Sequence, residues 1–291
     1  MAVTLWSGLV LGSVYALVAA GFAIAMVPTG IFNFAQGAIV IGGSFLTYQF
    51  LAATKIPTAL AVVLTVLVGM GAGLACELLA VRPLRWGRGT VESSAMVTTV
   101  GASTALIGLL AIKWGELPLQ VPFIGPGGYL HFLGVVGQPV QITVVVLAVV
   151  SALALEAFFR YTRTGRVCLA VAEDRDAAML RGVNVSALSL AAFALAGAFG
   201  AAAGVVIGPI TYAEPVLGTT LALYGFVAVA LGGEGSFIGG LIGGLIVGLV
   251  GSLAIRYLGA SYGDIAVLGL LLVTLAVRPK GLGGSTKARS V

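Results

Sequence analysis

Residues 162–184 read TRTGRVCLAVAEDRDAAMLRGVN, and this basic stretch interrupts a chain that is otherwise strongly apolar. Five arginines fall in or directly beside it: Arg160, Arg163, Arg166, Arg175 and Arg181. Burying all five in a bilayer would cost on the order of 15 kcal/mol, at roughly 3 kcal/mol each. The stretch therefore lies outside the membrane, between apolar segments that cross it.

The composition is that of an integral membrane protein. Of the 291 residues, 59% are hydrophobic and 9% are charged, against about 25% charged in soluble domains. The mean hydropathy is +1.13. The net charge of +5 fits basic loops retained on one side of a membrane better than a nucleic-acid surface. We expect membrane lipid and no nucleic acid among the partners.

Nine apolar segments predict an all-α, polytopic helical bundle, forming a single membrane domain over residues 1–291. Most of them are near the length of about 20 residues that a span requires. The segments are roughly 5–27, 34–52, 57–80, 95–112, 140–160, 188–209, 218–232, 236–255 and 262–277. A count of eight is the alternative, either by merging 218–255 or by losing one short segment.

The basic residues also predict an orientation. Twelve of the fifteen Lys and Arg residues fall in three gaps, and short basic loops stay in the cytoplasm. Besides the five named above, these are Arg82, Arg85, Arg88, Arg278, Lys280, Lys287 and Arg289. The loop 161–187 and the C-terminus are then cytoplasmic, and the N-terminus is outside. The first segment is expected to be a retained span, because no basic residue precedes Lys55 as a signal peptide would require.

The loop 161–187 carries the signals of a short helix. Asp174 suits the N-cap, Asp176 the first turn, Arg181 the last turn and Gly182 the position after the helix. These signals predict a helix of about seven or eight residues, with a length of about 10–12 Å.

This helix could serve to dock a soluble partner. Ala178, Met179 and Val183 would give it an apolar contact patch. The alternative is a solvated connection without a partner.

Two other places break the apolar pattern. Residues 28–37, PTGIFNFAQG, bring the amides of Asn33 and Gln36 among Pro and Gly residues. Gly232 and Gly233 follow a segment of only about 15 residues, which is shorter than the bilayer core. Paired breaks in two halves indicate a substrate path between inverted repeats. For residues 28–37, a cytoplasmic turn is the alternative to an unwound stretch that lines a cavity.

Glycines at four-residue steps predict close helix packing. The chain has 43 glycines, about twice the usual share, and small residues at this spacing let helices approach in lipid. The steps are Gly8/Gly12, Gly69/Gly73, Gly200/Gly204/Gly208 and Gly240/Gly244/Gly248. The prolines and glycines of loop 113–139, by contrast, exclude a continuous helix there.

Catalytic and metal-binding motifs are missing from the sequence. A single histidine, His131, rules out a His-based metal cluster, and there is no phosphate-binding loop of the GxxxxGK[ST] type. Acidic residues are almost absent from the apolar segments; Glu77, close to the inner end of its segment, is noted as an exception. This scarcity argues against an ion-coupled carrier, which normally needs such residues within the membrane. Cys76 and Cys168 fall in different environments, so a disulfide is not expected.

Taken together, these motifs resemble the permease subunits of bacterial ABC importers for branched-chain amino acids, specifically the shorter of the two paired permeases. The similarity runs along nearly the whole chain. The residues that carry it are 8–20 (GLVLGSVYALVAA), 29–37 (TGIFNFAQG), 164–184 (TGRVCLAVAEDRDAAMLRGVN), 230–239 (ALGGEGSFIG) and 278–283 (RPKGLG).

The resemblance implies a pore subunit of the inner membrane that has no ATPase activity and binds no cofactor. Its partners would be a second permease (a longer homologue or an identical copy), two cytoplasmic ATPases that bind ATP and Mg²⁺, and a periplasmic or lipid-anchored solute-binding protein. The implied coupling helix for the ATPase comprises Glu173, Asp174, Arg175, Asp176, Met179, Arg181 and Gly182. The residues expected near the substrate path are Asn33, Phe34, Gln36, Gly232 and Gly233.

The expected cargo is a branched-chain or other hydrophobic amino acid. A permease for urea, short amides or another small solute would share the same motifs. A stand-alone channel or secondary carrier is the alternative from a different class, and it would transport its solute without an ATPase.

Overall fold

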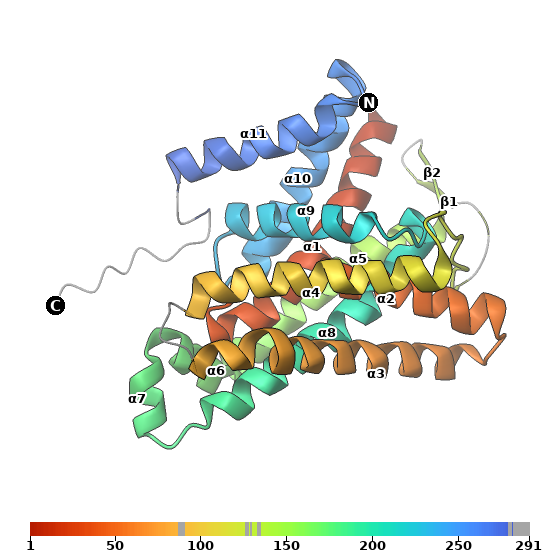
Figure 1. Cartoon of the computed structure of the whole chain (residues 1–291). Coiled ribbons are helices and arrows are strands. Elements are labelled where there is room, and N and C mark those ends of the chain that lie inside the picture. Colours follow the sequence, from red (N-terminus) through yellow and green to blue (C-terminus); the bar gives the residue numbers. More distant parts are fainter. Residues whose placement is uncertain (87–90, 126–127, 129, 133–134, 279–280, 282–291) are drawn as a thin grey trace.

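The computed structural model describes residues 1–86, 91–125, 128, 130–132, 135–278 and 281, most of which lie in helices (Figure 1). Each of the nine predicted apolar segments forms a helix, which confirms the helical, polytopic class. Two further helices lie in the basic loop. Arg88, Lys280, Lys287 and Arg289, on which part of the predicted orientation depends, lie outside the described residues.

Among the described residues, six helices are long and apolar enough to cross a membrane. They are α1 (Ala2–Thr29), α3 (Thr58–Cys76) with its continuations η2 (Glu77–Val81) and η3 (Arg82–Trp86), α4 (Val91–Trp114), α5 (Pro139–Tyr161), α8 (Val185–Thr211) and α10 (Phe237–Leu258). Three shorter apolar helices are α2 (Gln36–Tyr48), which η1 (Gln49–Ala53) continues, α9 (Leu217–Gly232) and α11 (Tyr262–Val277).

α9 and α10 are separate helices. Between them Gly233 and Gly235 have φ angles of +96° and +82°, a backbone region that glycine enters without a steric penalty. The chain reverses at this point, so the alternative that merges residues 218–255 into one span is wrong.

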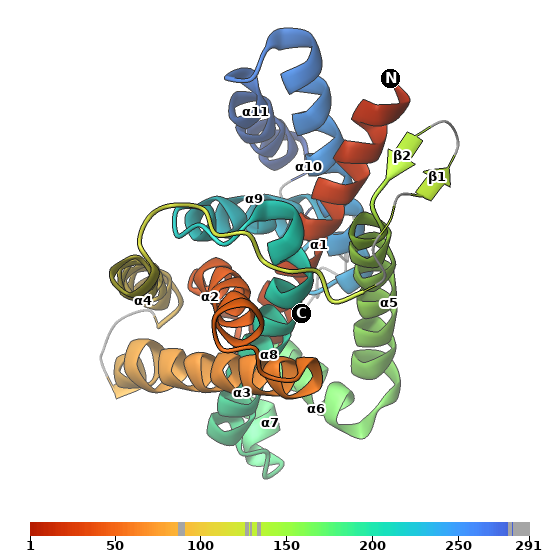
Figure 2. The same cartoon turned by 90° about the vertical axis from the view of Figure 1, so that its right-hand side faces the viewer.

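α1 is the most deeply buried of the six long helices, and α4 is the most exposed. Viewed from the side, α1, α2 and α8 lie between the outer helices α3, α4, α5 and α11 (Figure 2). The outer helices present large apolar side chains outward, including Leu67, Leu109, Val150 and Leu272. Such surfaces fit a surrounding of lipid or of another membrane subunit.

The glycine steps mark the closest helix contacts, as predicted. Gly8 and Gly12 of α1 face Gly244 and Gly248 of α10, and a Cβ at Gly12 would lie 2.7 Å from the Cα of Leu245. Gly69 and Gly73 of α3 face α8 in the same way. A side chain at these positions would push the helices apart.

The loop after α4 is irregular, as predicted, but it contains elements that the sequence did not reveal. The strands β1 (Leu130–Phe132) and β2 (Val135–Gly137) pair as an antiparallel hairpin, and Leu119 forms a β-bridge with Ala213 after α8.

The basic loop folds as two helices, α6 (Arg163–Glu173) and α7 (Arg175–Leu180), rather than one. α7 starts at the predicted place but has six residues instead of seven or eight. α6 was not predicted. Its buried positions, Gly165, Cys168 and Val171, recur every three residues, but the charged residues of the segment obscured this pattern in the sequence. In Figure 1, α7 lies at the same end of the molecule as the start of α4 and the end of α11.

Candidate functional site

Three side chains fix the course of the α6–α7 segment. Thr162, Asp174 and Asn184 each stand at an N-cap, where a side-chain oxygen accepts a hydrogen bond from a backbone N–H of the first turn. These bonds come from Gly165 (3.0 Å), Ala177 (2.9 Å) and Ala187 (3.0 Å). Each such cap stabilises its helix by about 1 kcal/mol. Because Thr162 and Asp174 are single-residue joints, α5, α6 and α7 follow one another without a flexible linker.

α7 ends as its sequence predicts. Gly182 has φ +84°, and its N–H donates to the carbonyl of Met179 at 2.9 Å. Glycine is favoured after a helix because it adopts this left-handed conformation freely.

The outer face of this segment is open to solvent. The seven predicted coupling residues are all exposed: Glu173, Asp174, Arg175, Asp176, Met179, Arg181 and Gly182. Leu180 is the most exposed large apolar residue of α7, with 90% of its surface exposed, although the sequence did not single it out. Exposed apolar side chains among charges are typical of a surface that meets another protein.

The inner face of α7 packs on the start of α8. Ala178 is buried with Val171 and Val185, and Val183 covers this small cluster. Met179, predicted to form an apolar contact patch with Ala178 and Val183, is 47% exposed and open to a partner. Ala178 and Val183 instead pack inward against α8, because adjacent positions of a helix point about 100° apart.

A hollow of about 470 Å³ adjoins α7 on the outside. Two arginines, Arg82 and Arg175, are among the residues that line it, together with Met179. The hollow suits an acidic or polar protrusion of a partner protein.

Cys168 is buried between α6 and the bundle, although it lies in the basic loop. Burial raises the pKa of its thiol above the ordinary value. Both cysteines are free, which confirms that no disulfide joins them.

The second candidate region, residues 30–35, is an irregular segment between α1 and α2 (Figure 1). α1 continues through Pro28 and ends at Gly30, which has φ +71°. Ile31, Phe32, Asn33 and Ala35 are buried. The segment is therefore no solvated turn; it passes through the interior of the bundle.

Polar side chains tie this segment to three helices. Asn33 Oδ1 accepts hydrogen bonds from the N–H of Ala35 and the thiol of Cys76, each at 3.2 Å. Gln36 Nε2 donates to the carbonyl of Ala196 on α8 at 3.0 Å. Thr99 of α4 accepts from the N–H of Phe34 at 3.3 Å.

Two buried polar atoms, one in this segment and one at the first residue of α2, are unsatisfied. Asn33 Nδ2 and Gln36 Oε1 are buried and have no hydrogen-bond partner. An unpaired polar atom in the interior costs about 1–3 kcal/mol, so such atoms mark places where another conformation, water or a ligand can supply the partner.

Aromatic rings cover the other side of the segment. Phe34 is half-buried, and its ring lies 6.0 Å from that of Phe22 and 5.6 Å from that of Phe226 on α9. Phe32 joins the same cluster. The predicted path residues Asn33, Phe34 and Gln36 are thus brought together between α1, α4, α8 and α9.

Gly232 and Gly233 do not join them. A Cβ at Gly232 would overlap the backbone of Gly239 and Gly240. Gly233 lies against Gly281, where a Cβ on Gly281 would come within 2.5 Å of the N of Gly233. Both glycines serve the tight turn from α9 into α10.

Within the described part of the chain, no three His, Cys, Asp or Glu residues gather as metal ligands. Glu77, the acidic residue noted in the sequence, is buried in η2, where it accepts a hydrogen bond from Ser189 at 2.9 Å. Glu156 of α5 was missed, although its spacing of four residues from Arg160 offered a signal; the two form an ion pair.

Comparison with known proteins gives a consistent result. A family model described as "Branched-chain amino acid transport system / permease component" matches residues 4–276. The high-affinity branched-chain amino acid transport system permease protein LivH of Escherichia coli (strain K12) is 30% identical over 300 residues, which cover 99% of this chain and 96% of LivH. The permease protein BraD of Pseudomonas aeruginosa is 29% identical over 299 residues, or 98% of this chain and 96% of BraD.

More distant similarities are also found. The ribose import permease protein RbsC of Escherichia coli (strain K12) is 26% identical over 156 residues, about half of each chain. Among solved structures, PsaBC from Streptococcus pneumoniae in complex with Fab matches with a TM-score of 0.53 over 94% of this chain and 91% of that chain, at 11% identity. At this identity the likeness concerns the fold alone.

Proposed function

Since the chain belongs to the family of permease components of branched-chain amino acid transport systems, we propose that it forms one half of the membrane pore of an ATP-driven importer for these amino acids. The match over residues 4–276 carries this proposal. The cargo is inferred from the names of relatives such as LivH and BraD, which match this chain along almost its full length.

In the proposed assembly this chain pairs with a second permease, either a longer homologue or an identical copy. Two cytoplasmic ATPases bind ATP and Mg²⁺, and a periplasmic or lipid-anchored binding protein delivers the solute. This chain itself binds no cofactor. The large apolar surfaces of α3, α4 and α11 are available for lipid and for the second permease.

The proposed orientation places α7 in the cytoplasm and the N-terminus outside. Arg82, Arg175 and Arg278 belong to segments that lie at one end of the bundle in Figure 1. Basic residues favour the cytoplasmic side. The β1–β2 hairpin, at the opposite end, then faces the periplasm.

α7 is the proposed contact with the ATPase. It is held by caps at both ends, and it presents Met179 and Leu180 between charged residues. Closure of the ATPases on ATP would displace α7, and the rigid joints at Thr162 and Asp174 would pass the displacement to α5. Such a push powers transport only if the two states of the pore differ in their contacts with ATPase and solute.

The proposed substrate path runs beside residues 33–36. Phe34, which is only half-buried, would contact the solute. Asn33 and Gln36 are fully buried, so they would support the wall from behind or turn toward the path in another state. Gly232 and Gly233 would shape the inner end of the path through their turn.

Reconstitution in proteoliposomes tests the proposal. The chain together with its partner permease, ATPases and binding protein should take up radiolabelled leucine only when ATP is supplied on the ATPase side. Leucine uptake by liposomes that contain this chain alone would contradict the proposal and favour a stand-alone carrier.

The choice of cargo has its own test. The purified binding protein should bind leucine, isoleucine or valine in a calorimeter and ignore urea and acetamide. The reverse preference would assign the chain to a permease for small amides while leaving the pore function intact.

A further inference from the structure

We propose that Glu156 is a positioning residue that links the ATPase-docking segment to the start of α10, and through it to the turn between α9 and α10. This inference rests on the proposed function. Glu156 lies on α5, about two turns before α6 begins, and only 13% of its side chain is exposed.

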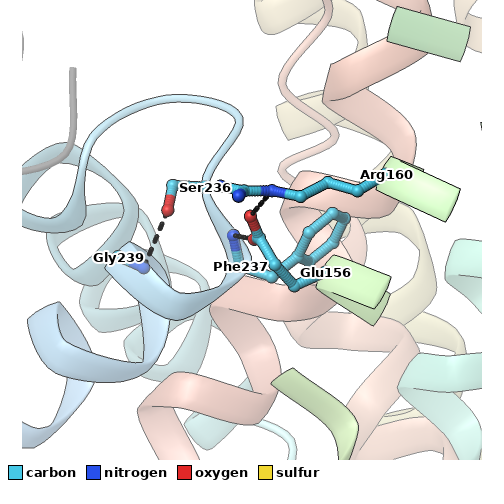
Figure 3. Close-up of polar contacts among 5 residues, drawn as sticks. All are labelled: Glu156, Arg160, Ser236, Phe237 and Gly239. Carbon is cyan, nitrogen blue, oxygen red and sulfur yellow. Dashed lines mark hydrogen bonds and ion pairs between the residues drawn. The ribbon is translucent and has the colours of Figure 1, made fainter. Parts of the chain in front are cut away.

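The carboxylate of Glu156 is shared between two helices (Figure 3). Its Oε1 pairs with Nε of Arg160, one turn further along α5, at 2.6 Å. Its Oε2 accepts a hydrogen bond from the backbone N–H of Phe237, the first residue of α10, at 3.2 Å.

The contact occupies a position where a carboxylate is effective. The first N–H groups of a helix have no acceptor within the helix, and the helix dipole favours a negative charge there. Ser236 accepts from Gly239 at 2.9 Å as the ordinary N-cap of α10. The bond from Glu156 is thus a second cap, and it is supplied by another helix.

Aromatic packing supports the same contact. The rings of Phe159 on α5 and Phe237 on α10 lie 4.8 Å apart, and both side chains are buried. The end of α5 therefore holds the start of α10 by an apolar contact and a charged hydrogen bond together.

The link continues in both directions. Toward the docking segment, α6 packs tightly on the end of α5, since a Cβ at Gly165 would overlap the backbone of Phe158 and Phe159. Toward the pore, α10 begins directly after the α9–α10 turn, in which Gly232 fits against Gly239. A displacement of α7 thus has a continuous contact route to that turn.

The test compares four variants of the complete importer in proteoliposomes. Glu156→Ala removes both bonds, and Glu156→Gln keeps an acceptor for Phe237 but loses the charge. Arg160→Ala removes only the ion pair, whose arginine side chain is 66% exposed. Ser236→Ala removes the ordinary cap of the same helix and serves as the matched control.

The decisive readout is the amount of leucine taken up per ATP hydrolysed, measured with co-purification of the ATPase and the thermal stability of the complex. A charged hydrogen bond contributes enough for about a tenfold shift between two states. We expect a ratio about tenfold lower for Glu156→Ala and about threefold lower for Glu156→Gln, with the ATPase still bound. Arg160→Ala and Ser236→Ala should stay within about twofold of the wild-type ratio.

An unchanged ratio in Glu156→Ala would overturn the link. So would an equal loss in Ser236→Ala, because any weakening of the α10 start would then have the same effect. If Glu156→Ala fails to assemble, Glu156→Gln decides: a lowered ratio at wild-type stability supports the link, and a wild-type ratio overturns it. Failure of the wild-type chain to bind an ATPase would instead contradict the proposed function.

Discussion

The α6–α7 segment and residues 30–35 both interrupt the apolar helices, yet they have opposite surroundings. In α6–α7 the polar groups are satisfied by caps within the segment, and the outer face, from Glu173 to Gly182, is exposed. In residues 30–35 the backbone is irregular and buried, and Asn33 depends on partners from elsewhere in the bundle. A segment whose polar groups are satisfied by its own helix caps can face a partner protein. A segment whose polar groups form hydrogen bonds to other helices is held inside the membrane domain.

The largest effect is expected on the exposed side of this comparison. Leu180→Asp places a charge at the most exposed apolar position of α7, so ATPase binding and ATP-driven leucine uptake should fall by about tenfold or more. Pull-down of the ATPase and uptake in proteoliposomes measure both. Leu117→Asp, at a similarly exposed apolar residue after α4, is the matched control and should leave ATPase binding unchanged.

The next effect concerns the buried side. A Cβ at Gly21 would overlap the side chain of Gln36, so Gly21→Ala should destabilise the protein by about 1–3 kcal/mol. Thermal unfolding in detergent measures the loss. Adding Gln36→Ala should restore part of it, and Gly42→Ala, where a Cβ meets open space, should show no loss. Equal stability of all variants would mean that residues 30–36 are not tightly held.

A smaller effect separates two roles of Asp174, which caps α7 and also lies on the proposed docking face. Asp174→Asn keeps the cap but removes the charge, whereas Asp174→Ala removes both and should cost about 1 kcal/mol of local helix stability. If the charge takes part in docking, both variants weaken ATPase affinity. If only Asp174→Ala does so, Asp174 acts through the shape of α7 alone.

The smallest effect is expected on the rate of thiol labelling at Cys168, which is buried between α6 and the bundle. Burial raises the pKa of Cys168, so less thiolate is present near neutral pH and maleimide should react slowly. The labelling rate of Cys168 should rise over a higher pH range than that of the exposed thiol in Leu180→Cys. That variant is made in a chain without the native cysteines. Equal rates for the two thiols would place Cys168 at the surface.

Local signals were sufficient for much of the docking segment. Asp174 and Gly182 occupy the predicted ends of α7, because a cap needs only neighbours within three or four residues. α6 escaped notice because its buried face includes a glycine and a cysteine instead of large apolar residues. Leu180 escaped because exposure depends on how α7 lies on α8.

The buried segment could not be predicted in the same way. Proline and glycine around residues 28–37 predicted a break but left a turn and an interior stretch as alternatives. The partners that decide between them, Cys76 for Asn33 and Ala196 for Gln36, are 43 and 160 positions away. Glu156 escaped for the same reason, because Phe237 is 81 positions from it. Contacts of this range follow from the packing of whole helices.

We propose that α7 faces the cytoplasm as the docking surface for an ATPase. Labelling of Leu180→Cys with a membrane-impermeant maleimide tests it most directly, in a chain whose native cysteines are replaced by serine. We predict that the thiol is modified in inside-out vesicles but not in intact spheroplasts, and that added ATPase protects it. Modification from the outside, or equal modification with and without the ATPase, would contradict the account.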